Sequence, residues 1–195
     1  MNLPKVLICI LCGPERHHWV NPQLVATLLR TLKDKRFETD IEFIFGSHGI
    51  DVARNLSVEK ARQKQVDWCI QFDNDMMCND PLGILAEAEA ARLDIVALSA
   101  GIIGTGGAIE PNVAFAGERC GNFMRVSAAG AGVLMIHSRV WAALPKLFEG
   151  NHEDVHFCQI AQAAGFKVWT HASLAGHLHS VDLTAYLRGI GTGAT

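Results

Sequence analysis

Apolar runs of strand length alternate with helical patterns along most of this chain, and no other feature restricts its fold as strongly. The runs are continuous rather than broken by polar residues, which is typical of strands buried on both faces of a sheet. They are predicted at Lys5–Leu11, Ile41–Phe45, Asp67–Phe72, Ile95–Leu98, Val133–Ile136 and Lys167–Thr170. The pattern predicts an α/β fold in which helices cover both faces of a mainly parallel sheet.

Helix-capping residues place the helices between these strands. Asn21-Pro22 and Asp80-Pro81 each join an N-cap residue to a proline at the first helical position. The helices are predicted from Asn21 toward Lys35, from Asp51 to about Gln65, from Asp80 to about Arg92, from Ser138 to about Phe148 and from His152 to Ala164. Gly101–Gly107 is predicted to be a loop, the first part of a longer specificity loop over Gly101–Arg119.

Length and charge limit the class of protein. The chain has 195 residues, enough for one domain, which we expect to span residues 1–188 before a flexible tail at 189–195. Its formal charge of −3 argues against general nucleic-acid binding, which needs a basic surface. The first apolar run is too short for a membrane span, and no small-residue cleavage site follows it. We therefore expect a cytoplasmic protein without a transmembrane segment.

The six cysteines lack the spacing of a disulfide scaffold, so free and mostly buried thiols are expected. Cys9 and Cys12 form a C-x-x-C pair. In a strand with a period of two residues these side chains point to opposite faces, which argues against a redox pair. A zinc ribbon would need a second C-x-x-C pair, and the sequence has none.

Two carboxylates stand at the carboxyl end of the third predicted strand. Asp73 and Asp75 flank Asn74 and form a D-x-D motif where the run Trp68–Phe72 stops. Open α/β sheets bind ligands at the carboxyl ends of their strands, and hard divalent cations that bridge phosphate oxygens need oxygen donors. The motif therefore predicts a metal–diphosphate site. The alternative is a polar turn, since Asp and Asn are common turn formers.

A second motif, His152-Glu153-Asp154-Val155-His156, matches the H-E-x-x-H of zinc peptidases. There the two histidines lie one helical turn apart and the glutamate acts as general base. Gly150-Asn151 puts the motif in the first helical turn, whereas zinc peptidases carry it further inside a helix. His171, His177 or His179 could supply a third ligand, so a zinc-dependent hydrolase stays open as an alternative function.

Several short motifs follow one another in an order that resembles a known family. They are Gly49–Asn55, Asp73–Asp75, Gly130–Ile136, Glu153–Cys158, Ala163–Val168 and Gly176–Leu178. In this order they resemble the nucleotide-sugar glycosyltransferases of the Rossmann-like glycosyltransferase-A fold, in particular family-two-like bacterial and phage members. The resemblance spans about Lys5 to His179, which is nearly the whole chain.

The resemblance implies a metal-dependent and inverting transfer of a sugar, of the hexosyltransferase type, from a nucleoside-diphosphate sugar to an acceptor hydroxyl. A UDP-sugar is the expected donor. A Mn²⁺ or Mg²⁺ ion across both phosphates would stabilise the leaving diphosphate. By resemblance Asp75 is a direct metal ligand, Asp73 contacts the ribose or the metal side, and Asn74 shapes the donor-binding turn.

The resemblance also assigns residues from the second half of the chain. His177 corresponds to a metal-side histidine, and His179 competes with it because it would share the same strand face. Asp154 corresponds to the general base that takes the proton of the acceptor hydroxyl, with Glu153 as the competing candidate.

Residues from the first half are expected at the nucleotide. Cys12, Gly13 and Pro14 end the first strand and would face the nucleoside. Arg54 could orient the nucleotide through its fork of donors; the alternative is an ordinary solvated helix residue. The segment Gly46–His48 replaces an acidic nucleobase contact that the family has after its second strand. The chain also lacks the long acceptor region of larger relatives, so a homo-oligomer could complete the acceptor site.

Two further function classes use part of the same pattern. A metal-dependent nucleotidyltransferase would share the D-x-D motif, but it would normally carry a Gly-rich, basic loop after the first strand, and Cys12–Arg16 fits that poorly. A non-catalytic nucleotide-sugar binder would keep Asp73 and Asp75 but would not need Asp154.

Overall fold

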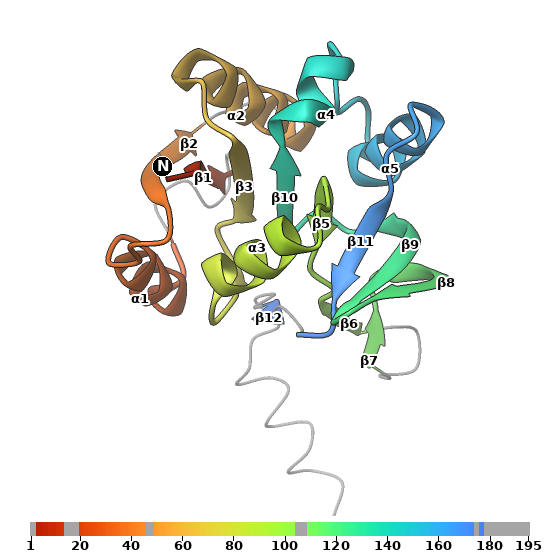
Figure 1. Ribbon diagram of the computed structural model, residues 1–195, viewed down its shortest axis with the longest axis horizontal. Coiled ribbons are helices and arrows are strands. Elements are labelled where there is room, and N and C mark those ends of the chain that lie inside the picture. Colours follow the sequence, from red (N-terminus) through yellow and green to blue (C-terminus); the bar gives the residue numbers. More distant parts are fainter. Residues whose placement is uncertain (1–2, 14–19, 46–48, 104–108, 174–175, 178–195) are drawn as a thin grey trace, which may run out of the picture.

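The computed structural model describes residues 3–13, 20–45, 49–103, 109–173 and 176–177, and a mixed β-sheet forms its centre (Figure 1). The strands of the central sheet are β1 (Lys5–Cys12), β2 (Glu38–Phe45), β3 (Trp68–Asp73), β5 (Ile95–Ala97), β8 (Val113–Cys120), β9 (Phe123–Ala129), β10 (Val133–His137) and β11 (Val168–His171). They lie in the order β2-β1-β3-β10-β5-β11-β9-β8. Two small pairs add β4 (Met76–Met77) with β12 (Gly176–His177), and β6 (Gly101–Ile103) with β7 (Ile109–Pro111).

Helices cover both faces of this sheet, as predicted (Figure 1). They are α1 (Pro22–Thr31), α2 (Ile50–Lys64), α3 (Pro81–Ala90), α4 (Ser138–Ala143) and α5 (Glu153–Ala163). Apolar residues of α1 and α3 pack into one core, and those of α2, α4 and α5 pack into the other. Strand β1 supplies both cores by alternation, because its even-numbered residues point to the first and its odd-numbered residues to the second.

The expectation of a mainly parallel sheet is wrong. Strand β1 is parallel to β2 and β3, but β10 is antiparallel to both of its neighbours, β3 and β5. The cause is the hairpin of β8 and β9, which reverses the chain at Gly121, a residue with φ of 58°. Only Gly130–Gly132 separates β9 from β10, so the reversed direction continues into the centre of the sheet. Parallel neighbours would need a long crossover connection.

The predicted loop over Gly101–Arg119 is also wrong in most of its described part, which forms β6, β7 and β8. Residues 104–108 lie outside the described residues, as does the predicted tail. Two helices end earlier than predicted, α1 at Thr31 and α4 at Ala143. Helix α4 stops because Leu144 precedes Pro145 and adopts an extended backbone, with φ −117° and ψ 113°.

The six cysteines are free, and five of them are buried. Cys9 and Cys12 lie in different cores, so the prediction that their side chains point to opposite faces is confirmed. Within the described ranges, no helix has the length and apolar composition of a membrane span.

One close backbone approach fixes the end of β3. The Gly132 carbonyl accepts a hydrogen bond of 2.9 Å from the Asp73 amide. A Cβ atom on Gly132 would lie 2.8 Å from Sδ of Met76, whose side chain is fully buried. The absence of a side chain at position 132 therefore lets the loop after β9 pack against the turn that follows β3.

We expect Gly132→Ala to lower the free energy of unfolding by about 1 to 3 kcal/mol, because the added methyl group overpacks the Met76 site. Urea unfolding monitored by circular dichroism measures this loss. The matched control is Gly13→Ala, where the added Cβ meets no atom within 4 Å. Equal stability of the two variants would contradict this account of the Gly132 contact.

Candidate functional site

The D-x-D motif forms the turn between β3 and β4, at the carboxyl end of a central strand. Backbone hydrogen bonds hold it from neighbouring segments. The Asn74 amide donates to the carbonyl of Leu11 at 3.2 Å, and the Asn74 carbonyl accepts from the amide of Asn21 at 3.0 Å. Asn74 and Asp75 are both buried, with 6% of their surfaces exposed. The turn therefore lies at the edge of the hydrophobic core, and hydrogen bonds to β1 and to the N-cap residue of α1 fix its position.

Arg54 on α2 lies behind this turn and is only 2% exposed. Its Nη2 donates to Oδ1 of Asp73 at 3.0 Å, and its Nε donates to Oε1 of Glu153 at 3.1 Å. One guanidinium group therefore joins β3 to the start of α5. The alternative of a solvated helix residue is wrong for Arg54, because its charge is buried and paired with protein carboxylates.

Burial raises the pKa of Asp73 to about 6, and the guanidinium of Arg54 opposes that shift. Asp75 and Glu153 raise the pKa of Asp73 further through their negative charges. Both carboxylates thus lie close enough to repel the carboxylate of Asp73. Carboxylate oxygens are donors that Mg²⁺ and Mn²⁺ prefer, but within the described residues these three side chains are not grouped closely enough to hold a metal ion by themselves.

Gln71 and Ser57 form a hydrogen-bond network with Arg54, and neither residue was predicted from the sequence. Gln71 is fully buried in β3; its Oε1 accepts from Nη1 of Arg54 at 3.4 Å, and its Nε2 donates to Oγ of Ser57 at 2.6 Å. The Arg54 carbonyl accepts from both, at 3.1 Å from Gln71 and 2.7 Å from Ser57. A single amide inside the apolar run of β3 was the available signal for this network.

The two acidic residues at the start of α5 have different surroundings. Glu153 is buried and bound to Arg54, whereas Asp154 is half-buried and its Oδ1 accepts from the Val155 amide at 2.7 Å. Adjacent residues on a helix do not share a face, so one turns inward while the other stays near the surface. Both carboxylates sit at the positive end of the helix.

The H-E-x-x-H motif also lies at this helix start. His152 is the N-cap residue and is exposed, and His156 is half-buried. The carboxylate that a zinc peptidase would use as general base belongs to Glu153, which the buried guanidinium of Arg54 already engages. Within the described part of the chain, no three His, Cys, Asp or Glu side chains are grouped so that they could hold a metal ion.

The remaining predicted site residues divide into described and undescribed ones. Strand β12 runs antiparallel to β4, with the backbone of His177 opposite Met76, the residue that follows Asp75. Cys12 is 2% exposed and faces the core, whereas Gly13 borders open space. Pro14 and His179 lie outside the described residues. The roles of all five residues stay predictions.

Hydrogen bonds join the segment between α4 and α5 to α2 and place the Phe148 ring beside the guanidinium of Arg54. The Asn55 Nδ2 donates to the carbonyl of Phe148 at 2.7 Å, and Arg62 donates to the carbonyls of Trp141 and Leu144. The Phe148 ring stacks on Phe157 at 4.9 Å, and the guanidinium carbon of Arg54 lies 6.0 Å from the Phe148 ring centre. These contacts fix the path of the chain into α5.

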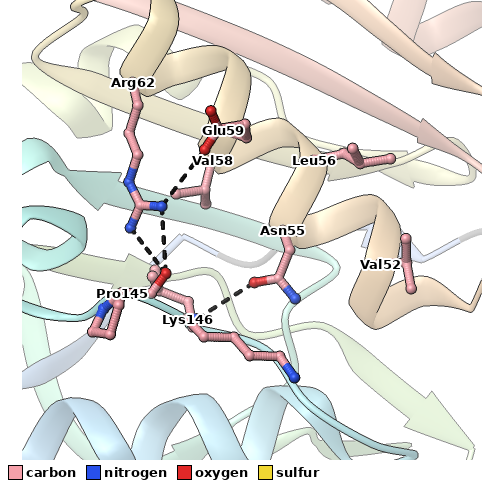
Figure 2. A pocket seen from close by; sticks show the side chains of 9 residues that line it. Val52, Asn55, Leu56, Val58, Glu59, Arg62, Pro145 and Lys146 are labelled. Carbon is pink, nitrogen blue, oxygen red and sulfur yellow. Dashed lines mark hydrogen bonds and ion pairs between the residues drawn. The ribbon is translucent and has the colours of Figure 1, made fainter.

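A pocket of about 320 Å³ lies between α2 and this segment (Figure 2). It is lined by Val52, Asn55, Leu56, Val58, Glu59, Arg62, Pro145, Lys146 and Leu147. Figure 2 shows the Asn55 amide and the Arg62 guanidinium directed at the 145–147 segment. Arg54, Asp73 and Glu153 do not line this pocket, so it is separate from the carboxylate cluster.

Comparison with known proteins identifies the fold. No family model matches this sequence, and no curated protein matches it. Among solved structures, A197 from STIV aligns with a TM-score of 0.62 at 16% identity, over 91% of this chain and 87% of that chain. GalNAc-T7, solved with UDP, GalNAc and Mn²⁺, aligns with a TM-score of 0.54 at 12% identity, over 91% of this chain and 43% of that chain.

A UDP-glucose pyrophosphorylase in its apo form aligns with a TM-score of 0.50 at 8% identity, over 87% of this chain and 74% of that chain. At these identities the similarity concerns the fold. The chain has a glycosyltransferase-A-like fold, as the motif order predicts, with a mixed sheet in place of the expected mainly parallel one. Proteins with different names share this fold: one is a UDP-glucose pyrophosphorylase, and the other, GalNAc-T7, was solved with UDP and GalNAc.

We expect Asn55→Ala to lower the free energy of unfolding by about 1 to 3 kcal/mol, because the Phe148 backbone loses both of its Asn55 partners. The matched control on the same helix is Gln63→Ala, whose exposed side chain bonds only to the Glu59 carboxylate and should matter by less than about 0.5 kcal/mol. Urea unfolding of both variants measures the difference. A loss at Asn55 no larger than at Gln63 would show that the segment before α5 does not depend on this tie.

Proposed function

We propose that this chain transfers a sugar, most simply a hexose from a UDP-sugar, to an acceptor hydroxyl in a metal-dependent and inverting reaction. One observation carries the proposal. The D-x-D turn and the acidic start of α5 meet at a single buried guanidinium, Arg54, which bonds Asp73 and Glu153. The two motifs that the family uses for the donor and the acceptor are thus neighbours in space, although they are far apart in the sequence.

The donor would lie along the carboxyl ends of β1 and β3. The diphosphate side belongs to Asp75 and Asp73, with His177 or His179 as the histidine of the metal side. Pairing of β12 with β4 supports His177, because its backbone lies beside the residue after Asp75. A bound Mn²⁺ or Mg²⁺ would supply electrostatic stabilisation of the leaving diphosphate. The nucleoside would contact Gly13, Pro14 and the backbone of Cys12, since the Cys12 side chain is in the core.

Asp154 is the proposed general base. Its half-exposed carboxylate can accept the proton of an acceptor hydroxyl, while the buried Glu153 carboxylate is engaged by Arg54. As Asp154 takes the proton, the acceptor oxygen would bond to the anomeric carbon on the side opposite the diphosphate. The bond from that carbon to the β-phosphate oxygen would break, the nucleoside diphosphate would leave, and the configuration would invert. Arg54 would act by holding Asp73 and Glu153 in place. A direct hydrogen bond from Arg54 to the nucleotide stays a prediction.

Two alternatives are separated by the products. A nucleotidyltransferase has support from the fold, which a UDP-glucose pyrophosphorylase shares, and it would release pyrophosphate from a nucleoside triphosphate and a sugar phosphate. The proposed transferase releases a nucleoside diphosphate only when an acceptor hydroxyl is present. A panel of UDP-sugars, sugar phosphates and hydroxyl acceptors, with product detection by phosphorus NMR, distinguishes these reactions. Binding of UDP-sugar without any turnover would indicate a non-catalytic binder.

We expect Asp75→Ala to abolish Mn²⁺-dependent binding of UDP while the protein stays folded, because a carboxylate at the sheet rim contributes to the ligand site more than to the core. Isothermal titration calorimetry with and without Mn²⁺ measures the effect. Asp40→Ala, which removes a largely exposed carboxylate on β2, is the control and should bind as the wild type does. Undiminished binding by a folded Asp75→Ala protein would rule out the assigned role.

We expect Asp154→Asn to lower kcat by about 100-fold or more, the usual range for losing a general base, with nearly unchanged UDP affinity. The matched control is Asp51→Asn, a half-buried carboxylate in the first turn of α2. Steady-state kinetics and calorimetry together give the two quantities. Parallel losses in turnover and affinity would make Asp154 a donor or metal residue instead.

A further inference from the structure

The orientation of the Arg54 side chain is set by groups that take no part in the proposed chemistry. Gln71 accepts from Nη1 at 3.4 Å, and the amide of Gln71 is itself held by Ser57 and by the Arg54 carbonyl. The Phe148 ring lies 6.0 Å from the guanidinium carbon. The planar guanidinium therefore has a fixed direction rather than a range of rotamers.

The same planar group has two carboxylate partners from different parts of the fold. Nη2 lies 3.0 Å from Oδ1 and 3.3 Å from Oδ2 of Asp73, and Nε lies 3.1 Å from Oε1 of Glu153. The Arg54 and Glu153 side chains are 3% and 9% exposed, so water screens their interaction little. A rigid, buried donor with two partners transmits a change at one partner to the other.

From this geometry we infer that Arg54 couples the donor side of the site to its acceptor side, with Glu153 and Gln71 as positioning residues for donor binding. The inference rests on the proposed function and adds residues that need not touch the donor. Glu153 lies on α5, next to the proposed base Asp154, yet it acts on Asp73 through the shared guanidinium. The acidic start of α5 would then serve the donor through Glu153 and the acceptor through Asp154.

The sign of the effect follows from charge and geometry. Replacing Glu153 by glutamine removes a negative charge close to Asp73, which weakens the attraction for a divalent cation. It also frees Arg54 to pair more fully with Asp73, so the guanidinium competes better with the cation for that carboxylate. Both changes weaken Mn²⁺-dependent donor binding. The direct loss of charge does not need Arg54, whereas the stronger competition for Asp73 requires the guanidinium and is the part that a double-mutant cycle isolates.

The test is a double-mutant cycle on the full chain, read out as the Kd of UDP in the presence of Mn²⁺. We expect Glu153→Gln to raise the Kd about fivefold, within the range of coupling between groups in one ion-pair network. Arg54→Lys keeps the charge but lacks the planar fork, so Glu153→Gln should change the Kd by less than about twofold in that background. Gln71→Met should also raise the Kd, and it replaces Arg54→Lys in the cycle if that variant does not fold.

Controls separate positioning from a general loss of structure. Glu89→Gln alters a carboxylate on α3 that accepts a hydrogen bond from Trp68, and it should leave the Kd unchanged. Urea unfolding of each variant confirms that the protein is folded under the binding conditions, since a purely structural role lowers stability without changing the Kd of the folded protein. Additive effects, or an unchanged Kd in Glu153→Gln, would overturn the inference alone. Failure of the wild type to bind UDP with Mn²⁺ would overturn the proposed function and the inference with it.

Discussion

A buried arginine holds the candidate site together. Removing Arg54 from water is costly, and the cost is offset by Asp73, Glu153 and Gln71, whose side-chain oxygens accept hydrogen bonds from three of its nitrogen atoms. Removing one member of a buried ion pair typically costs about 3 to 5 kcal/mol, because the other charge is left without compensation. Arg54 therefore links the end of β3 to the acidic start of α5, and each of these segments helps to stabilise the charge that the other uses. Local stability and the geometry of the site depend on the same contacts.

This arrangement gives two neighbouring acidic residues different surroundings. Helix α5 starts at the sheet rim, and its first turn presents Glu153 to the core and Asp154 toward the surface. The ties from Asn55 and Arg62 to the preceding segment determine where that first turn lies. A shift of this segment would move both carboxylates together. The position of the proposed base therefore depends on contacts between α2 and the segment before α5, which involve neither Asp73 nor Asp75.

The sequence predicts the site's motifs better than it predicts the sheet that holds them. Continuous apolar runs locate six strands of the central sheet to within a few residues, and the Asp73–Asp75 turn lies at the end of β3 as predicted. Strand β8 escapes notice because most of its residues are exposed and its pairing with β9 is irregular, so neither alternation nor an apolar run marks it. Because the sequence does not reveal the β8–β9 hairpin, it also gives no sign that β10 runs antiparallel to its neighbours.

The buried polar network shows the other limit. Arg54 lies on a helix with several charged residues, and nothing in the local pattern distinguishes an inward arginine from an outward one. Its partners come from β3 and α5, so only the tertiary fold brings the three together. Gln71 is the exception, because one amide within an apolar strand needs a buried partner, and the sequence alone indicates that such a partner must exist.

The proposed function depends on the Asp73–Asp75 turn binding a metal-bound nucleoside diphosphate. The decisive measurement is a crystal structure of the protein with UDP and Mn²⁺, in which anomalous scattering locates the manganese. We expect one strong anomalous peak within coordination distance of an Asp75 carboxylate oxygen and of the diphosphate, with the nucleoside toward Gly13. A diphosphate bound elsewhere, or a manganese ion held by His152 and His156, would show that the turn is not the donor site.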